Sequence, residues 1–281
     1  MTGAALRRAA VLGHPVAHSL SPTLHRAAYA ALGLEQWRYD AVDVTEEDLP
    51  AFIGSLDDTW AGLSLTMPLK QTVIPLLDHI EPLAQVVGAV NTVLLQGGGG
   101  SRVLVGANTD VHGLVEALGE GLGGAPVSTA AVIGAGATAS STLAALAQLG
   151  CVSPVVYVRA MSRAGGLMRA AHRMGVTPVF RLIDAAAGEI GRADVVVSTL
   201  PPHAADALAE ALVGPGAGVL LDVAYDPRPT ALSTAWAAAG GVVVGGERML
   251  LHQAAEQVRL MTGRPGPVAQ MSDALESQLP H

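Results

Sequence analysis

The stretch VIGAGATAS, at positions 132–140, decides the fold of the second half of this chain. It joins an apolar run, predicted to be a strand over 129–133, to a segment predicted to be a helix over 137–148. Gly134 would permit a tight turn, and Gly136 would let a ligand approach the backbone. Because the amide groups at a helix N-terminus attract phosphate, the pattern predicts a dinucleotide site. A close-packed turn between strand and helix, without a ligand, is the alternative.

The residues after the next strand bear on which dinucleotide would bind. A site for NAD needs an acidic side chain about 20 residues on, which accepts a hydrogen bond from the ribose 2′-hydroxyl. No Asp or Glu occurs between positions 121 and 183, and the predicted strand over 155–158 runs into Arg159 and Arg163. Since a guanidinium group pairs well with phosphate, NADP is favoured. A solvated, arginine-rich helix start is the alternative.

Outward from this stretch, apolar runs that resemble strands alternate with helical patterns along the whole chain. The expected strands are 9–13, 37–44, 61–65, 90–95, 102–106, 129–133, 155–158, 194–199 and 218–223. The expected helices are 22–32, one beginning near Pro68, 111–118, 137–148 and 249–261. The tetraglycine at 97–100 is typical of a hairpin connection. With 50% hydrophobic but only 3% aromatic residues, the chain is predicted to be an α/β protein with an aliphatic core.

Charge and cysteine content narrow the partners and the compartment. A net charge of −8 argues against nucleic acid and anionic lipid as partners. The uncharged stretch 121–158 is interrupted by glycines and prolines, so no membrane span is expected. The apolar run 9–13 is too short for the core of a signal peptide. Cys151 is the single cysteine, which fits a reducing cytoplasm.

Lys70 is the candidate for proton transfer. It is the only lysine beside fifteen arginines, and lysine, unlike arginine, can lose its proton in a suitable site. It ends the segment LSLTMPLK at 63–70, where a strand runs into a helix. Ligands of α/β proteins bind at such strand ends. A stray surface lysine is the alternative.

Three further side chains complete the candidate site. Asp110, in GANTDVHG at 106–113, could hold the Lys70 ammonium group, or could instead cap the following helix. Ser19 and Ser21, in HSLSPTLH, could bind a carboxylate at a helix start. The alternative is ordinary helix-start chemistry, with Ser21 as the N-cap and Pro22 at the first helical position. No metal is expected, because the nearby histidines lack carboxylate or thiolate partners at ligand spacing.

Taken together, these motifs resemble those of the shikimate dehydrogenase family. The motifs follow one another in the family's order between about residues 9 and 263: HSLSPTLH, LTMPLK, GAVNTV, GANTD, GAGATAS, LDVAYDP and GERMLLHQAAEQ. The resemblance implies reduction of 3-dehydroshikimate to shikimate by NADPH, a reaction of aromatic amino acid biosynthesis. Quinate or aminoshikimate dehydrogenases of the same family are alternatives, as is a non-catalytic NADPH-binding regulator.

The resemblance also implies a role for each matching residue. Lys70 and Asp110 would be the catalytic pair. The substrate would be bound by Ser19, Ser21, Thr66, Asn91, Asp110, Tyr225 and Gln253. The cofactor would be bound by Gly134, Ala135, Gly136, Ala137, Thr138, Arg159, Arg163, Val223, Gly246 and Met249.

The family fold implies two α/β domains with a cleft between them. A discontinuous substrate domain, residues 1–110 plus 246–281, would contain a mixed sheet, and a doubly wound Rossmann-type domain, residues 111–245, would bind NADP. The chain would act on a small molecule as a monomer or homodimer. It departs from the family at Val158-Arg159-Ala160, where Asn-Arg-Thr is frequent, and at Ser198-Thr199-Leu200-Pro201, in place of an Asn-Ala-Thr-Pro segment. The first departure would remove side-chain contacts to the adenosine.

Overall fold

The structure is a computed structural model, and it describes residues 5–97 and 102–279. The chain forms two compact units: residues up to Thr109 with Gln253–Leu279 make the first, and Asp110–His252 make the second. The chain passes between the units at the start of helix α5 (Asp110–Leu122) and within helix α11 (Gly246–Thr262). Because α11 is continuous, its beginning groups with the second unit and its remainder with the first.

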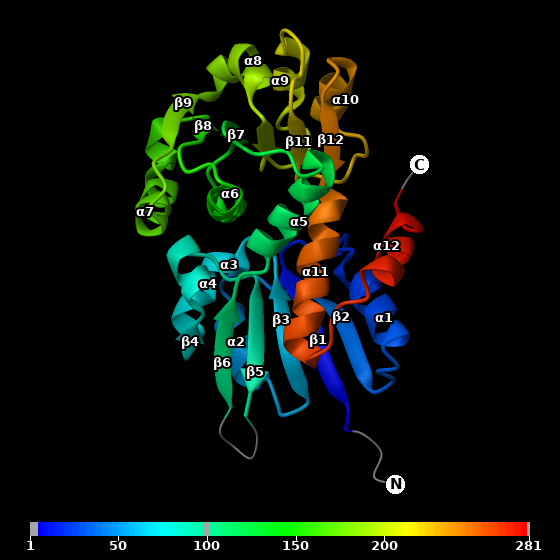
Figure 1. The fold of residues 1–281 in the computed structure, drawn as a ribbon. Coiled ribbons are helices and arrows are strands. Elements are labelled where there is room, and N and C mark those ends of the chain that lie inside the picture. Colours follow the sequence, from blue (N-terminus) through cyan, green and yellow to red (C-terminus); the bar gives the residue numbers. More distant parts are fainter. Residues whose placement is uncertain (1–4, 98–101, 280–281) are drawn as a thin grey trace. The chain divides into compact units, whose positions relative to one another are not determined.

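The first unit contains a six-stranded mixed sheet in the order β2-β1-β3-β5-β6-β4 (Figure 1). Its strands are β1 (Arg7–Gly13), β2 (Trp37–Asp43), β3 (Trp60–Leu65), β4 (His79–Ile80), β5 (Thr92–Gln96) and β6 (Val103–Ala107). Strands β1, β2 and β3 are parallel, whereas β5 is antiparallel to both β3 and β6. The predicted connection at 97–100 lies largely outside the described residues, but β5 and β6 on its two sides pair as a hairpin.

Helices cover both faces of this sheet, and the period-two alternation of β1 supplies both cores. Ala10 and Leu12 face one way, into a core with α2 (Leu49–Ser55), α3 (Leu69–Thr72) and α4 (Pro82–Val87). Ala9 and Val11 face the other way, into a core that includes Tyr29 of α1 (Ser21–Ala31) and Met261 of α11. On this second side, α12 (Val268–Glu276) packs beside α1. The carboxyl end of α11 is therefore fixed against the first sheet.

The second unit is a doubly wound sheet of six parallel strands, in the order β12-β11-β10-β7-β8-β9. Its strands are β7 (Ala130–Ile133), β8 (Val155–Val158), β9 (Val179–Leu182), β10 (Val195–Ser198), β11 (Val219–Asp222) and β12 (Val242–Gly245). This is the order of the Rossmann fold, in which the chain changes direction across the sheet between β7 and β10. The predicted fold class is confirmed: a mixed sheet in the first unit and a Rossmann-type sheet in the second.

Two layers of helix cover the second sheet. On one face, α8 (Ala186–Glu189), α9 (Asp206–Ala211) and α10 (Ala231–Ala238) enclose a core centred on Trp236. On the other, α6 (Ala137–Gln148) packs between α5 and α7 (Gly165–Met174). The near-continuous apolar strands follow from this arrangement, because a parallel sheet buries both of its faces.

The predicted elements are found with small shifts in their bounds, and α6 and β8 agree residue for residue. One predicted end was wrong, because α5 continues past Leu118 and through two glycines to Leu122. A Cβ atom on Gly121 would lie 2.7 Å from side chains of both Val219 and Val244. Glycine therefore lets the helix pack closely on the sheet rather than ending it. The sequence analysis missed the elements α2, β4, α4, α7, β9, α8, α9, α10, β12 and α12.

Candidate functional site

The glycine-rich turn of the second unit joins β7 to α6, as predicted. Gly134 has a φ of +118°, and an added Cβ atom would collide with the Thr199 hydroxyl oxygen. Its N–H donates to the carbonyl oxygen of Tyr157 at 2.9 Å, so the turn is tied to the end of β8. Glycine is required here by the chain's own geometry.

Gly136 has a different reason to be glycine. It is the N-cap of α6, its φ of −87° suits any residue, and a Cβ atom would meet nothing within 4 Å. Packing within the chain therefore does not demand a glycine. The amides of the first turn, which have no acceptor within the helix, and the open space beside Gly136 fit a pyrophosphate that approaches the backbone.

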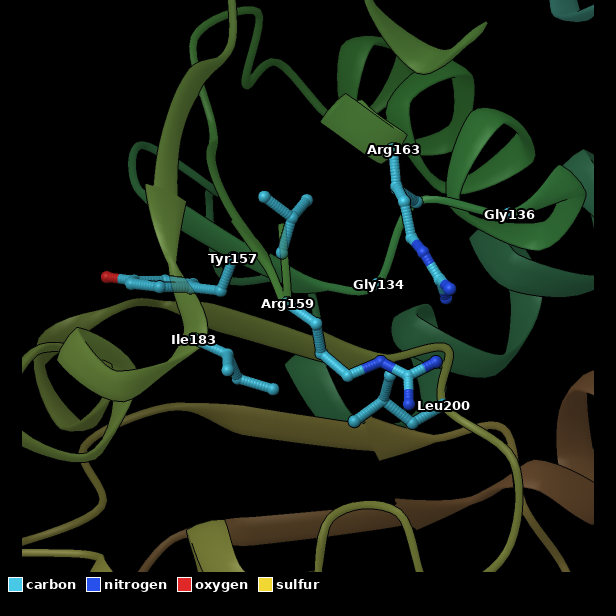
Figure 2. Close-up of a pocket in the computed structure, with 9 residues that line it drawn as sticks. Gly134, Gly136, Tyr157, Arg159, Arg163, Ile183 and Leu200 are labelled. Carbon is cyan, nitrogen blue, oxygen red and sulfur yellow. The ribbon is translucent and has the colours of Figure 1, made fainter. Parts of the chain in front are cut away.

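A pocket of about 220 Å³ opens beside this turn (Figure 2). It is lined by Gly134, Ala135, Gly136, Tyr157, Val158, Arg159, Arg163, Ile183 and Leu200. Figure 2 shows the side chains of Arg159 and Arg163 extending to the same side of the pocket. Ligand pockets generally measure about 300–1,000 Å³, so this one has the size for one end of a dinucleotide. None of its lining side chains is acidic, and a phosphate fits beside the two guanidinium groups.

The pocket also contains three residues that were not predicted to bind the cofactor through their side chains. Tyr157, Ile183 and Leu200 are apolar or aromatic, and they lie near the carboxyl ends of three different strands. Tyr157 donates its hydroxyl to Glu189 at 2.7 Å, and this bond holds the carboxylate beside the ring. Only the strand order brings these side chains together, although their strand-end positions were a signal that could have been used.

The other predicted cofactor residues lie at the carboxyl end of β11 and the start of α11. An added Cβ atom on Gly246 would collide with the carbonyl group of Val223, so these two backbones lie in direct contact. Met249 is buried one turn further along α11. Tyr225 lines a separate pocket that also contains the ion pair between Arg228 and Glu247, at 3.2 Å. Burial raises the pKa of Tyr225.

In the first unit, Asn91 and Gln253 meet in a buried polar cluster. The Asn91 amide nitrogen donates to the Gln253 side-chain oxygen at 3.2 Å and to the Thr109 hydroxyl at 2.9 Å. The backbone N–H of Thr109 donates to the Asn91 side-chain oxygen at 2.7 Å. Asn91 precedes β5, Thr109 follows β6, and Gln253 lies on α11. The cluster therefore fixes two predicted substrate residues that are 162 positions apart in the chain.

Thr66 and Lys70 lie together on the segment that follows β3. The Thr66 N–H donates to the Leu12 carbonyl at 2.9 Å, and the Lys70 carbonyl accepts from the Val90 N–H at 2.8 Å. The second bond places the backbone of Lys70 next to the residue that precedes Asn91. Asp110 is the first residue of α5 and is only 3% exposed. The pairing of Lys70 with Asp110 stays a prediction.

The two predicted serines lie at the start of α1. The Ser19 hydroxyl oxygen accepts from the Ser21 N–H at 3.3 Å, and the Ser21 side chain hydrogen-bonds to the Tyr39 hydroxyl. Helix-start chemistry with Ser21 as the N-cap is wrong by one position, because Leu20 is the N-cap and α1 begins at Ser21 itself. Leu20 has no side-chain oxygen that could accept hydrogen bonds from the free backbone N–H groups of the first turn.

Among the described residues, neither a metal site nor a membrane-spanning helix is found. Within 5–97 and 102–279, no three His, Cys, Asp or Glu side chains gather as metal ligands would. His14 pairs with Asp43 at 2.6 Å, and His25 is buried beside Gln257. No helix in the described ranges is both long and apolar enough to cross a membrane.

Comparisons with known proteins place these observations in a family. The model described as the shikimate dehydrogenase substrate binding domain matches residues 11–93, and that described as the shikimate 5′-dehydrogenase C-terminal domain matches residues 246–276. The shikimate dehydrogenase (NADP(+)) of Moorella thermoacetica is 38% identical over 280 residues, which covers 96% of this chain and 92% of the relative. The chain belongs to the shikimate dehydrogenase family.

Solved structures of shikimate dehydrogenases have the same fold. The enzyme from Mycobacterium tuberculosis is 39% identical, has a TM-score of 0.86, and is matched over 96% of this chain and 99% of that one. The enzyme from Thermus thermophilus, solved in complex with NADP(H) and shikimate, is 35% identical with a TM-score of 0.82, over 98% of this chain and 100% of that one. The similarity to shikimate dehydrogenases thus extends over both units, including the glycine-rich turn between the two matched family models.

Proposed function

We propose that this chain is an NADP-dependent shikimate dehydrogenase that interconverts 3-dehydroshikimate and shikimate. The observation that carries the proposal is the similarity to relatives of that name along nearly the whole chain. The motifs that resemble those of the family support it, because they contain Lys70, Asp110, Asn91 and Gln253, for which the resemblance implies catalytic and substrate-binding roles. As in the prediction from the sequence, residues 1–110 plus 246–281 would form the substrate domain, and residues 111–245 the NADP domain.

In this proposal, polar side chains of the first unit bind the substrate. Ser19 and Ser21, at the start of α1, would hold the carboxylate and so fix the direction of the ring. Thr66, Asn91 and Gln253 would bind ring hydroxyls. The buried cluster of Asn91 and Gln253 supports this role, since amides that are already oriented lose little entropy when they bind a ligand. Tyr225 would lie close to the substrate.

The reaction requires a hydride at the carbonyl carbon and a proton at its oxygen. Bound NADPH would supply the hydride, which is the difficult part of the chemistry. Lys70 would donate the proton to the ketone oxygen during reduction and take it back from the hydroxyl during oxidation. Asp110 would orient Lys70 and accept a hydrogen bond from the reacting hydroxyl. Positioning and general acid–base assistance are then the contributions of the protein itself.

The pocket beside the glycine-rich turn supports NADP over NAD. Arg159 and Arg163 both line this pocket, and none of its lining residues has a carboxylate to accept from a free ribose hydroxyl. A 2′-phosphate would therefore gain two charge-assisted partners, whereas a 2′-hydroxyl would lack an acceptor. Cofactor residues Ala137 and Thr138, in the first turn of α6, would lie on the pyrophosphate side.

The experiment is an assay of purified protein at the absorbance band of reduced nicotinamide. Shikimate and quinate are each combined with NADP+ and with NAD+. We expect turnover with shikimate and NADP+ to exceed the other three combinations by at least about tenfold. Preference for quinate would replace the proposal by a quinate dehydrogenase, and binding of NADPH without turnover of either substrate would replace it by a regulator. Size-exclusion chromatography of the same sample would distinguish monomer from homodimer, and cell fractionation would test the expected cytoplasmic location.

A further inference from the structure

A second line of buried polar groups in the first unit leads to the Asn91 cluster. It consists of Tyr39 on β2, Ser64 on β3, Gln257 on α11, and Thr92 at the start of β5, and it ends at Asn91. We name these five residues the Tyr39–Asn91 chain. Each of the five is at most 4% exposed, so none of their hydrogen bonds competes with bulk water.

The first links of this chain run in one direction. The Tyr39 hydroxyl donates to the Ser64 hydroxyl oxygen at 2.6 Å, and the Ser64 hydroxyl donates to the Gln257 side-chain oxygen at 2.8 Å. A hydroxyl has one proton to donate, so a hydroxyl that donates to one neighbour can only accept from its other neighbours. Gln257 must therefore present its oxygen to Ser64.

The orientation of Gln257 is fixed from a second side by His25. The His25 Nε2 atom lies 3.2 Å from the same Gln257 oxygen, and the ring stacks on Tyr39 with centroids 3.9 Å apart. Burial lowers the pKa of His25 to about 3, so the ring is neutral. Because an amide oxygen only accepts, the tautomer with its proton on Nε2 is the one that pairs with the oxygen to which Ser64 donates. A flipped Gln257 would direct its N–H₂ group at two donors.

The remaining links carry this orientation to Asn91. With its oxygen toward Ser64, Gln257 directs its nitrogen at the Thr92 hydroxyl, at 3.0 Å, and at the Asn91 carbonyl, at 3.2 Å. The Thr92 hydroxyl accepts that bond and donates to the Asn91 side-chain oxygen at 2.9 Å. The Asn91 amide nitrogen is then left to face Gln253.

We propose that Gln257 is a positioning residue, which acts through Thr92, together with the backbone N–H of Thr109, to hold the Asn91 amide in its orientation and thereby that of Gln253. This rests on the proposed function, in which Asn91 and Gln253 bind the non-reacting hydroxyls of the ring. Gln257 acts through its neighbours and determines how strictly those hydroxyls are recognised. The hydroxyl of Ser21 bonds to Tyr39 at the far end, so the Tyr39–Asn91 chain also joins the two ends of the proposed substrate site.

The test compares shikimate with an analogue that lacks one non-reacting ring hydroxyl. In the parent enzyme the missing hydroxyl should lower kcat/KM about tenfold, since it leaves a buried partner unpaired. In Gln257→Met we expect the KM for shikimate to rise about tenfold, with kcat changed less than threefold and the Kd of NADPH unchanged. The penalty for the missing hydroxyl should shrink to about twofold, because the amides that recognise it are no longer held.

Three further variants separate positioning from simple support of the fold. Thr92→Val removes the next link with nearly the same shape and should behave as Gln257→Met does, whereas Thr92→Ser keeps the hydroxyl and should restore the parent values. Thr262→Val, on the same helix, removes a hydroxyl that bonds only locally. It donates to the Val258 carbonyl at 2.7 Å or the Arg264 carbonyl at 3.5 Å, and it accepts from the Arg264 N–H at 3.1 Å. Thr262→Val should keep the tenfold preference for shikimate over the analogue that lacks one ring hydroxyl. If Gln257→Met does not fold, the two Thr92 variants give the same comparison.

The outcomes distinguish this proposal from the one on which it rests. A parent enzyme that fails to turn over shikimate would overturn both. A parent enzyme that is active, with Gln257→Met and Thr92→Val variants that melt earlier but keep the full tenfold discrimination, would overturn the positioning role alone. Binding of shikimate to the NADP+ complex, measured by calorimetry, should follow the same order as the KM values.

Discussion

The neutral, buried His25 makes the stability of the first unit depend on pH. Its side chain is fully enclosed, and burial lowers its pKa from 6.5 to about 3. In the unfolded chain the same ring titrates at its ordinary value near 6.5. Between pH 6.5 and pH 3 the unfolded state therefore binds a proton that the folded state does not, and the free energy of unfolding falls as the pH falls.

The size of the effect follows from the pKa difference. Each pH unit in that window changes the free energy of unfolding by about 1.4 kcal/mol. Lowering the pH from 7.5 to 4.5 crosses two units of the window, so His25 alone removes about 3 kcal/mol of stability. His25→Gln keeps a donor for Gln257 but cannot titrate, and we expect its stability to fall by about 3 kcal/mol less than the parent's over the same range.

Urea unfolding at the two pH values measures this difference. Of the three tryptophans, Trp37 and Trp60 belong to the first unit and Trp236 to the second, so a Trp236→Phe background makes fluorescence report on the first unit alone. Carboxylates that titrate in the same range are present in both proteins, so their contributions to the free energy of unfolding cancel when the two are compared. Thr262→Val is the control, since it removes no titratable group. Parallel pH dependences for the parent and His25→Gln would refute the reasoning.

Further predictions concern the proposed catalytic and cofactor residues. Lys70→Ala should lower kcat by about 10²–10⁴ with little change in KM, and unchanged turnover would remove Lys70 from the proton transfer. Arg159→Ala should weaken NADPH about 10–100-fold and NADH less than threefold, as judged by fluorescence titration; equal losses would contradict a phosphate contact. Gly134→Ala should lower the melting temperature, because a positive φ costs about 1–2 kcal/mol and the Cβ atom collides with Thr199. Gly136→Ala should melt as the parent does but bind NADPH more weakly, and the reverse pattern would show that the two glycines have exchanged roles.

Local patterns in the sequence were enough to predict the fold class and the glycine-rich turn. The turn between β7 and α6 is specified within about twenty residues, since the strand, the glycines and the helix each have their own signal. The absence of an acid after β8 is likewise a local fact that favours NADP. The shortest of the missed elements, such as β4 and α8, contain too few residues to show a repeated hydrophobic pattern.

The tertiary structure decided which distant residues meet. Asn91 and Gln253 are 162 positions apart, and Ser64 and Gln257 are 193 apart, yet each pair forms a buried hydrogen bond. No local pattern contains these contacts, because they arise only when α11 packs against the first sheet. Gln257 stands one helical turn after Gln253, and that spacing was the one signal of its position in the sequence. The local amino-acid sequence thus determined which segments are helices and which are strands. The packing of α11 against the first sheet determined which polar groups of these elements pair with each other.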